Sequence, residues 1–140
     1  MSDLTVGTEI TPLVVRPTPI SLFRFSAVTW NPHRIHFDEA YAATEGYPGV
    51  LVQGHLHGAW LLSAVRRWIG DRGRIEQFAW QNRHFATPGD TLTITGQIVS
   101  VDGDLVEVEL SETNQDGVVC APARATFRVH PGGAFGDATR

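Results

Sequence analysis

The sequence predicts an α+β fold in which an antiparallel β-sheet wraps around one central helix. Two observations carry this prediction. Residues 54–69 are apolar on nearly every side of a helix, and residues 75–129 alternate between apolar and polar side chains as strands do. A helix of that kind must be covered on most sides, and an antiparallel sheet with one apolar face can cover it.

The first half of the chain is irregular and helical. The residues best suited to cap helices are Thr18, which Pro19 follows, and Asp38, while Gly70 is suited to end the long helix. The expected elements are a strand at 13–15, a helix from Pro19 toward Val28, a short helix from Asp38 through Thr44, and a long helix from about Gly54 to Ile69.

The second half reads as a meander of four strands, each with one buried face. The expected strands run over residues 75–85, 92–101, 105–110 and 124–129, with turns at 102–104 and 114–117. One buried helix followed by such a meander is the hot-dog arrangement, and the pattern leaves another α+β roll open as the alternative. We expect a single domain over residues 1–130 and a flexible tail over 131–140.

Composition excludes several functions. The net charge is −4 and no basic run occurs, which argues against a nucleic-acid-binding surface. Hydrophobic residues make up 42 % of the 140 residues, enough for a core. Cys120 is the single cysteine, so a reducing compartment is expected. No signal peptide is evident and the longest apolar stretch, around residues 56–65, is too short to span a bilayer; we expect a cytoplasmic protein without a membrane partner.

The densest polar segment is Asn31-Pro32-His33-Arg34-Ile35-His36-Phe37-Asp38, and the long helix opens with Gln53-Gly54-His55. Here the chain resembles the MaoC-like, or (R)-specific, enoyl-thioester hydratases and 3-hydroxyacyl-thioester dehydratases. Their signature places an aspartate five positions before a histidine and a glycine at the start of the central helix. The sequence of this segment, together with the Glu-Gly-Tyr-Pro-Gly that follows it, is most similar to the mitochondrial-type dehydratase and mesaconyl-CoA hydratase branch.

The resemblance has one departure: the aspartate position is Asn31. A gapped alignment would place Thr29 there instead. The ungapped version preserves the spacing to His36 and needs no insertion, so we prefer it.

The resemblance implies a role for each matching residue. His36 would shuttle the proton, since a histidine gains and loses protons near neutral pH. Asn31 cannot act as a base but would orient the water. The start of the helix at Gly54 and His55 would bind the thioester and stabilise negative charge on its oxygen. Arg83 and Arg124 are candidates for binding a phosphate of coenzyme A (CoA) or of an acyl carrier protein.

Each of these residues also has a purely structural interpretation. His36 could be a structural histidine, Asn31 a turn residue and Gly54 a helix-start glycine. His33 with His36, and His55 with His57, could suggest metal binding, but no further ligand completes a familiar spacing and we expect no metal. Cys120 is expected to be a packed thiol and no nucleophile.

The expected function is therefore a hydro-lyase of fatty acid metabolism that interconverts 2-enoyl and 3-hydroxyacyl thioesters of CoA or a carrier protein, without a redox cofactor. One alternative is a hot-dog thioesterase, which would want a carboxylate base where this chain has Gln53 and His55. Another is a non-catalytic or co-catalytic subunit of a heteromeric hydratase. The expected assembly is a homodimer or a heteromer with another hot-dog chain, with a shared substrate cleft.

Overall fold

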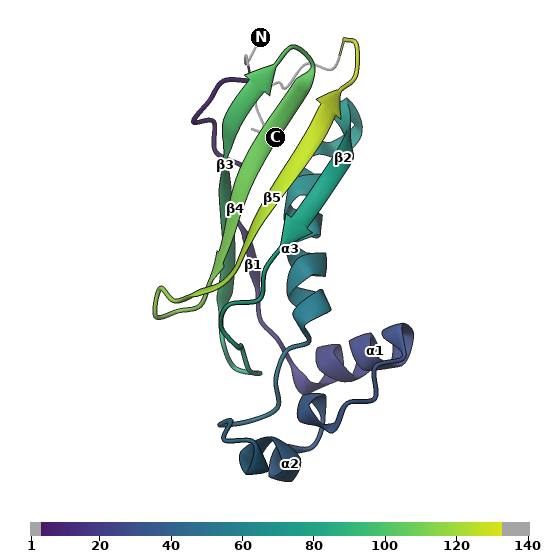
Figure 1. Ribbon diagram of the computed structural model, residues 1–140, viewed down its shortest axis with the longest axis vertical. Coiled ribbons are helices and arrows are strands. Elements are labelled where there is room, and N and C mark those ends of the chain that lie inside the picture. Colours follow the sequence, from purple (N-terminus) through teal and green to yellow (C-terminus); the bar gives the residue numbers. More distant parts are fainter. Residues whose placement is uncertain (1–3, 133–140) are drawn as a thin grey trace.

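A computed structural model describes residues 4–132 and contains one curled antiparallel sheet against one long helix (Figure 1). The elements in chain order are β1 (Leu13–Val15), α1 (Pro19–Thr29), the 3-10 turn η1 (Arg34–His36), α2 (Glu39–Thr44), α3 (Gly54–Ile69), the 3-10 turn η2 (Gly70–Arg72), β2 (Gly73–Trp80), β3 (Leu92–Asp102), β4 (Leu105–Thr113) and β5 (Val119–Val129). This is the hot-dog fold, which confirms the expected fold class.

The sheet order is β1-β3-β4-β5-β2, with every neighbouring pair antiparallel. The expected four-strand meander is therefore wrong in part, because only β3, β4 and β5 follow one another in space. Strand β2 crosses to the far side and pairs with β5, for example Phe78 with Ala125. As a result, α3 is covered both by β2, which follows it in the chain, and by the later strands β4 and β5.

The expected strand 75–85 is also wrong at its end, because β2 stops at Trp80. Residues 81–84 are all exposed, so they lack the alternating inward-facing apolar side chains that would continue a strand. The backbone still donates from Gln81 to Pro122 and from Arg83 to Cys120, so the segment stays beside β5 while leaving the regular ladder.

The core lies between α3 and the concave face of the sheet. Leu61, Val65 and Ile69 of α3 are at most 1 % exposed. They meet the inward residues of the strands, which include Ile94, Ile98, Val106, Val108, Ala125 and Phe127. A second, smaller cluster surrounds the start of α3 and contains Leu22, Val50, Val52, Leu56, Ala86, Leu92 and Cys120. That second cluster fixes α1 against the N-terminal end of α3.

The helix boundaries follow the expected capping. Thr18 caps α1 through its hydroxyl and Pro19 is its first residue, while Asp38 caps α2. Helix α1 ends at Trp30, which adopts the left-handed conformation with φ of 54°. Of the expected tail 131–140, residues 133–140 lie outside the described residues. Within residues 4–132, no helix combines the length and apolar character needed to cross a bilayer.

Candidate active site

His36 is held by the backbone that leads into α3. It is the last residue of η1, and its Nδ1 lies 2.8 Å from the carbonyl oxygen of Leu51. The amide of Leu51 donates in turn to the carbonyl of Ile35 at 2.9 Å. These two hydrogen bonds hold the segment before α2 against the residues that lead into α3.

This contact determines the protonation of the ring. A carbonyl oxygen only accepts, so Nδ1 of His36 must carry the hydrogen and donate it to Leu51. In the neutral ring, Nε2 is then the basic nitrogen. Burial lowers the pKa of His36 below its usual 6.5, the hydrogen bond to Leu51 raises it in part, and the neighbouring His33 lowers it again. Near neutral pH, His36 can therefore accept a proton at Nε2.

Asn31 follows directly on α1 and is held by it. Its amide donates to the carbonyl of Ser26 at 2.9 Å, and its side-chain oxygen accepts a long, 3.4 Å hydrogen bond from the amide of His33. Asn31 thus shapes a turn, and its amide NH₂ makes no hydrogen bond within the described part of the chain. The hydroxyl of Thr29 donates to the carbonyl of Phe25 at 2.6 Å, so this side chain is already hydrogen-bonded within α1. The contacts favour Asn31 over Thr29 as the residue available to a substrate.

The N-terminus of α3 is open. Gly54 is its first residue, and Gln53 precedes it without any side-chain hydrogen bond that caps the helix. The amide of Leu56 donates to the carbonyl of Gln53, whereas within the described residues the amides of Gly54 and His55 make no hydrogen bond and keep their donors for another partner. A Cβ on Gly54 would lie 2.3 Å from the side-chain nitrogen of Asn82, so a glycine is required for Asn82 to approach the helix start so closely.

Trp80 supports this helix start from the side. Its indole nitrogen donates to the carbonyl of Gly54 at 3.1 Å, and its ring packs so closely on Gly58 that a Cβ there would lie 2.5 Å away. His55 is exposed and its ring meets that of Trp80 edge-on, with centroids 5.6 Å apart. Trp80 therefore fixes the first turn that carries two of the candidate residues.

The two candidate phosphate-binding arginines line one pocket of about 480 Å³, together with Trp80 and Gln81. They differ in charge environment. Arg124 pairs with Glu107 at 2.6 Å and also with Glu109, whereas Arg83 donates to the neutral side chain of Gln81. Arg83 is thus better able than Arg124 to attract a phosphate, since its charge is not compensated by these carboxylates.

An apolar pocket of about 340 Å³ adjoins the segment that carries Asn31 and His36. Its lining is Phe23, Ser26, Ala27, Trp30, Pro32 and Phe37. Three of these residues, Trp30, Pro32 and Phe37, are direct sequence neighbours of Asn31 or His36, and Trp30 is 88 % exposed. An exposed apolar hollow of this kind is typical of a surface that binds an apolar ligand or a partner.

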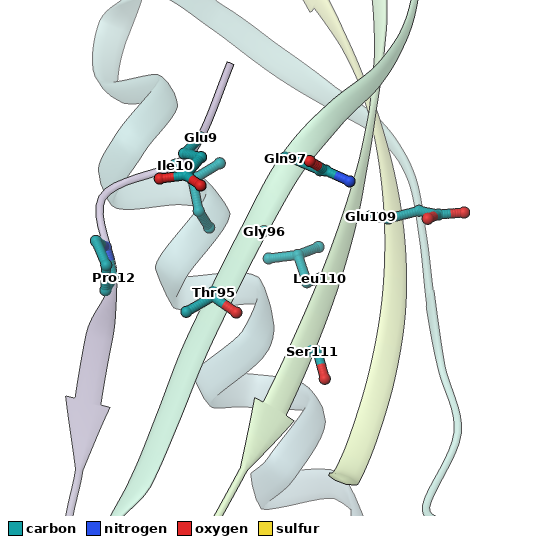
Figure 2. Close-up of a pocket in the computed structure, with 9 residues that line it drawn as sticks. All are labelled: Glu9, Ile10, Pro12, Thr95, Gly96, Gln97, Glu109, Leu110 and Ser111. Atoms are coloured by element: carbon teal, nitrogen blue, oxygen red, sulfur yellow. The ribbon is translucent and has the colours of Figure 1, made fainter. Parts of the chain in front are cut away.

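Other features of the molecule do not carry comparable chemistry. A pocket of about 330 Å³ lies between the N-terminal segment and strands β3 and β4, with Glu9, Gln97 and Glu109 among its residues (Figure 2). None of the expected site residues lines it. Cys120 is buried, and burial raises the pKa of its thiol to about 11, which leaves it protonated. Among residues 4–132, no three His, Cys, Asp or Glu side chains gather as metal ligands would.

From the sequence, Gln53 and His57 are named only in alternatives and Glu112 is not named, and all three are polar residues of the interior. Gln53, His57 and Glu112 are each at most 2 % exposed. His57 and Glu112 share a buried hydrogen bond. The alternation of β4 could have revealed Glu112, because it continues the inward series of Val106, Val108 and Leu110.

With this geometry established, comparison with known proteins decides the family. The model of the family hydroxyacyl-thioester dehydratase type 2 matches residues 7–88, more than half of the chain. The chain belongs to this family. The match includes the loop with Asn31 and His36 and all of α3, so the resemblance seen in the sequence is confirmed.

Two named proteins are similar to parts of this chain. A mesaconyl-C(4)-CoA hydratase of Chloroflexus aurantiacus is 53 % identical over 62 residues, which are 44 % of this chain and 22 % of that protein. A mitochondrial hydroxyacyl-thioester dehydratase type 2 of Saccharomyces cerevisiae is 28 % identical over 87 residues, 61 % of this chain and 30 % of that protein. The matched segments thus cover less than a third of the length of these relatives.

Solved structures agree on the fold. An (R)-hydratase from A. caviae involved in PHA biosynthesis superposes with a TM-score of 0.85 at 17 % identity, over 93 % of this chain and 100 % of that one. A chain of the ChsH1-ChsH2 complex from Mycobacterium tuberculosis gives a TM-score of 0.84 at 19 % identity, with the same coverage of both chains. At these identities the likeness shows the hot-dog fold alone.

Proposed function

We propose that this chain is a hydro-lyase that interconverts 2-enoyl thioesters and 3-hydroxyacyl thioesters. The observation that carries the proposal is the hydrogen bond from Nδ1 of His36 to Leu51, which leaves Nε2 as a base. It occurs in a chain of the hydroxyacyl-thioester dehydratase type 2 family, beside the open start of α3. The relatives named as hydratase and dehydratase support the same reaction class.

In the hydration direction, each residue has one role. Asn31 holds the water through its side-chain amide, and Nε2 of His36 takes a proton from it as the oxygen bonds to the β-carbon. The electron pair of the double bond moves toward the thioester oxygen, where the first-turn amides of Gly54 and His55 stabilise the negative charge. His36 then returns a proton to the α-carbon. Dehydration runs through the same steps in reverse.

The substrate is carried by CoA or by an acyl carrier protein. Both deliver the acyl group on a phosphopantetheine arm. Arg83 makes no ion pair among residues 4–132 and so supports a phosphate contact more strongly than the ion-paired Arg124 does. A role in fatty acid metabolism is part of the proposal and rests on this reaction. A cytoplasmic location is part of the proposal and rests on the single, buried, free cysteine.

We also propose that the chain functions with a second hot-dog unit, either another copy or a different chain. Strand β2 pairs with β5 on one side only and forms one edge of the sheet (Figure 1). Open edges of this length are normally paired or covered. Helix α1 adds exposed apolar side chains, with Phe23 at 67 % and Val28 at 82 % exposure. These two surfaces support a shared cleft, and the relatives' greater length and the solved two-chain complex are consistent with one.

The thioesterase alternative is less well supported. It needs a carboxylate that can activate water near the start of α3, where Gln53 is an amide. The carboxylate that does reach the second turn of α3, Glu112, is fully buried and hydrogen-bonded to His57. Neither residue can act as a solvent-accessible general base.

Two assays on the purified chain separate these functions. Hydration of crotonyl-CoA is followed by loss of enoyl-thioester absorbance, and thioesterase activity by release of free CoA to a thiol reagent. We expect hydration without CoA release. Release of CoA without hydration would establish the thioesterase, and absence of both activities that a second hot-dog chain restores would establish the subunit interpretation.

Sedimentation of the same sample tests the assembly. The expected result is a dimer or larger species that loses both association and hydration when a charge is placed on the exposed apolar face, as in Phe23→Glu. A stable monomer that still hydrates crotonyl-CoA would contradict the shared cleft.

A further inference from the structure

Gln53 joins α1 to the start of α3 by side-chain hydrogen bonds. Its side chain is 1 % exposed, and its Nε2 donates to the carbonyl of Leu22 at 2.8 Å and to the hydroxyl of Ser26 at 2.9 Å. The carbonyl of Gln53 accepts from Leu56 at 2.9 Å, so its backbone begins α3. One residue therefore joins the two helices that carry the two sides of the candidate site.

Ser26 extends this connection to Asn31. Its carbonyl oxygen accepts hydrogen bonds from the amides of both Trp30 and Asn31, which fixes the turn after α1. Its hydroxyl accepts from Gln53. The path from Asn31 through Ser26 and Gln53 to Gly54 consists entirely of hydrogen bonds and one peptide link.

The orientation of the Gln53 amide is determined by its partners. The carbonyl of Leu22 can only accept, so the NH₂ group must face it. Among residues 4–132, the amide oxygen, Oε1, then has no hydrogen-bond partner although it is buried. An unpartnered buried oxygen is unfavourable, so packing alone does not explain a glutamine here. A buried polar residue of this kind indicates a requirement for a fixed geometry.

We propose that Gln53, acting through Ser26, is a positioning residue that sets the distance between the water-orienting Asn31 and the oxyanion-binding amide of Gly54. This inference rests on the proposed function. Gln53 contacts no reacting atom. It acts by holding α1 against α3, so that both groups reach the same substrate in one geometry.

The test uses Gln53→Met, which keeps the length of the side chain and removes both hydrogen bonds, and Ser26→Ala, which removes one. Gln97→Met on the exposed surface of β3 is the matched control. Hydrogen exchange on a peptide covering residues 30–36 should be faster in both variants than in the parent and unchanged in the control. For crotonyl-CoA, kcat should fall about 10- to 100-fold with KM little changed, because geometry and not binding is lost.

Two further variants separate positioning from general damage. Ser26→Thr retains a hydroxyl and should recover most of the kcat lost in Ser26→Ala. The double variant Ser26→Ala with Gln53→Met should be no slower than Gln53→Met alone, since both act through one connection. Unchanged exchange in Gln53→Met, or faster exchange with an unchanged kcat, would overturn the inference. If the parent hydrates nothing, the proposed function fails, while the exchange of residues 30–36 still decides whether Gln53 holds the loop.

Discussion

His57 of α3 and Glu112 of β4 form a hydrogen-bonded pair inside the core, with side chains 3 % and 0 % exposed. The contact joins Nδ1 of His57 to one carboxylate oxygen of Glu112, and the other oxygen has no hydrogen-bond partner in the part of the chain that the structure describes. An acid–base pair of this kind stabilises a fold only while both partners are present, because either one alone would be a buried and unpaired polar group.

We therefore predict that single substitutions of this pair are much more damaging than a joint one. His57→Leu or Glu112→Leu should each lower the free energy of unfolding by about 3–5 kcal/mol, the usual effect of breaking a buried pair. The double variant should recover most of that loss. Urea unfolding followed by circular dichroism measures all three, and additive losses in the double variant would show that the two residues do not act as a pair.

The close approach of Asn82 to Gly54 gives a second prediction. Gly54→Ala should reduce hydration while the melting temperature stays near that of the parent, because the new Cβ stands at the open helix start and meets, at 2.3 Å, only the end of the exposed Asn82 side chain, which can turn aside. Gly54→Ala combined with Asn82→Ala should therefore melt as Gly54→Ala does. Melting temperatures and hydration rates of the two variants decide it; a large loss of stability in Gly54→Ala that the double variant regains would show that Asn82 is held in place.

The roles of Asn31 and Thr29 can be separated by matched variants. Asn31→Ala should lower kcat because the water is no longer held, and Asn31→Asp should retain part of the rate because it keeps an acceptor oxygen. Thr29→Ala should behave as the parent, since its hydroxyl is already bonded to Phe25. An inactive Thr29→Ala beside a normal Asn31→Ala would instead favour the gapped alignment.

The lowered pKa of His36 predicts the pH dependence. The neutral ring is the base, so kcat/KM for hydration should rise with pH through the pKa of His36, with a midpoint below 6.5, and level off near neutrality. The unfolded chain takes up this proton at higher pH than the folded chain, so stability also falls as pH drops below 6.5. Circular dichroism at each pH shows whether lost activity reflects titration or unfolding. A midpoint above 7 would contradict the assignment.

Local signals in the sequence predicted the local structure. The cap at Thr18, the cap at Asp38 and the apolar run from Gly54 to Ile69 each specify a helix through residues close to one another in the chain. The pairing of β2 with β5 is different, since it joins residues about fifty positions apart and leaves no local pattern. For the same reason the end of β2 was misplaced.

The site was predicted unevenly. The spacing of Asn31 to His36 is visible in the sequence, because one short loop carries both residues. The partners that hold them, Leu51 for His36 and Ser26 with Gln53 for Asn31, come from other segments. No spacing rule identifies a backbone carbonyl as a histidine's partner, so the choice of tautomer could come only from the folded structure.

The central claim is that His36 moves the proton in hydration, and its removal tests this most directly. His36→Ala should lower kcat for crotonyl-CoA by roughly 100- to 10,000-fold, the usual contribution of acid–base catalysis, while the melting temperature stays near that of the parent. His84→Ala, which removes an exposed histidine bonded to the neighbouring carbonyl of Phe85, should keep the parent rate. A folded His36→Ala variant that hydrates crotonyl-CoA at the parent rate would contradict the account.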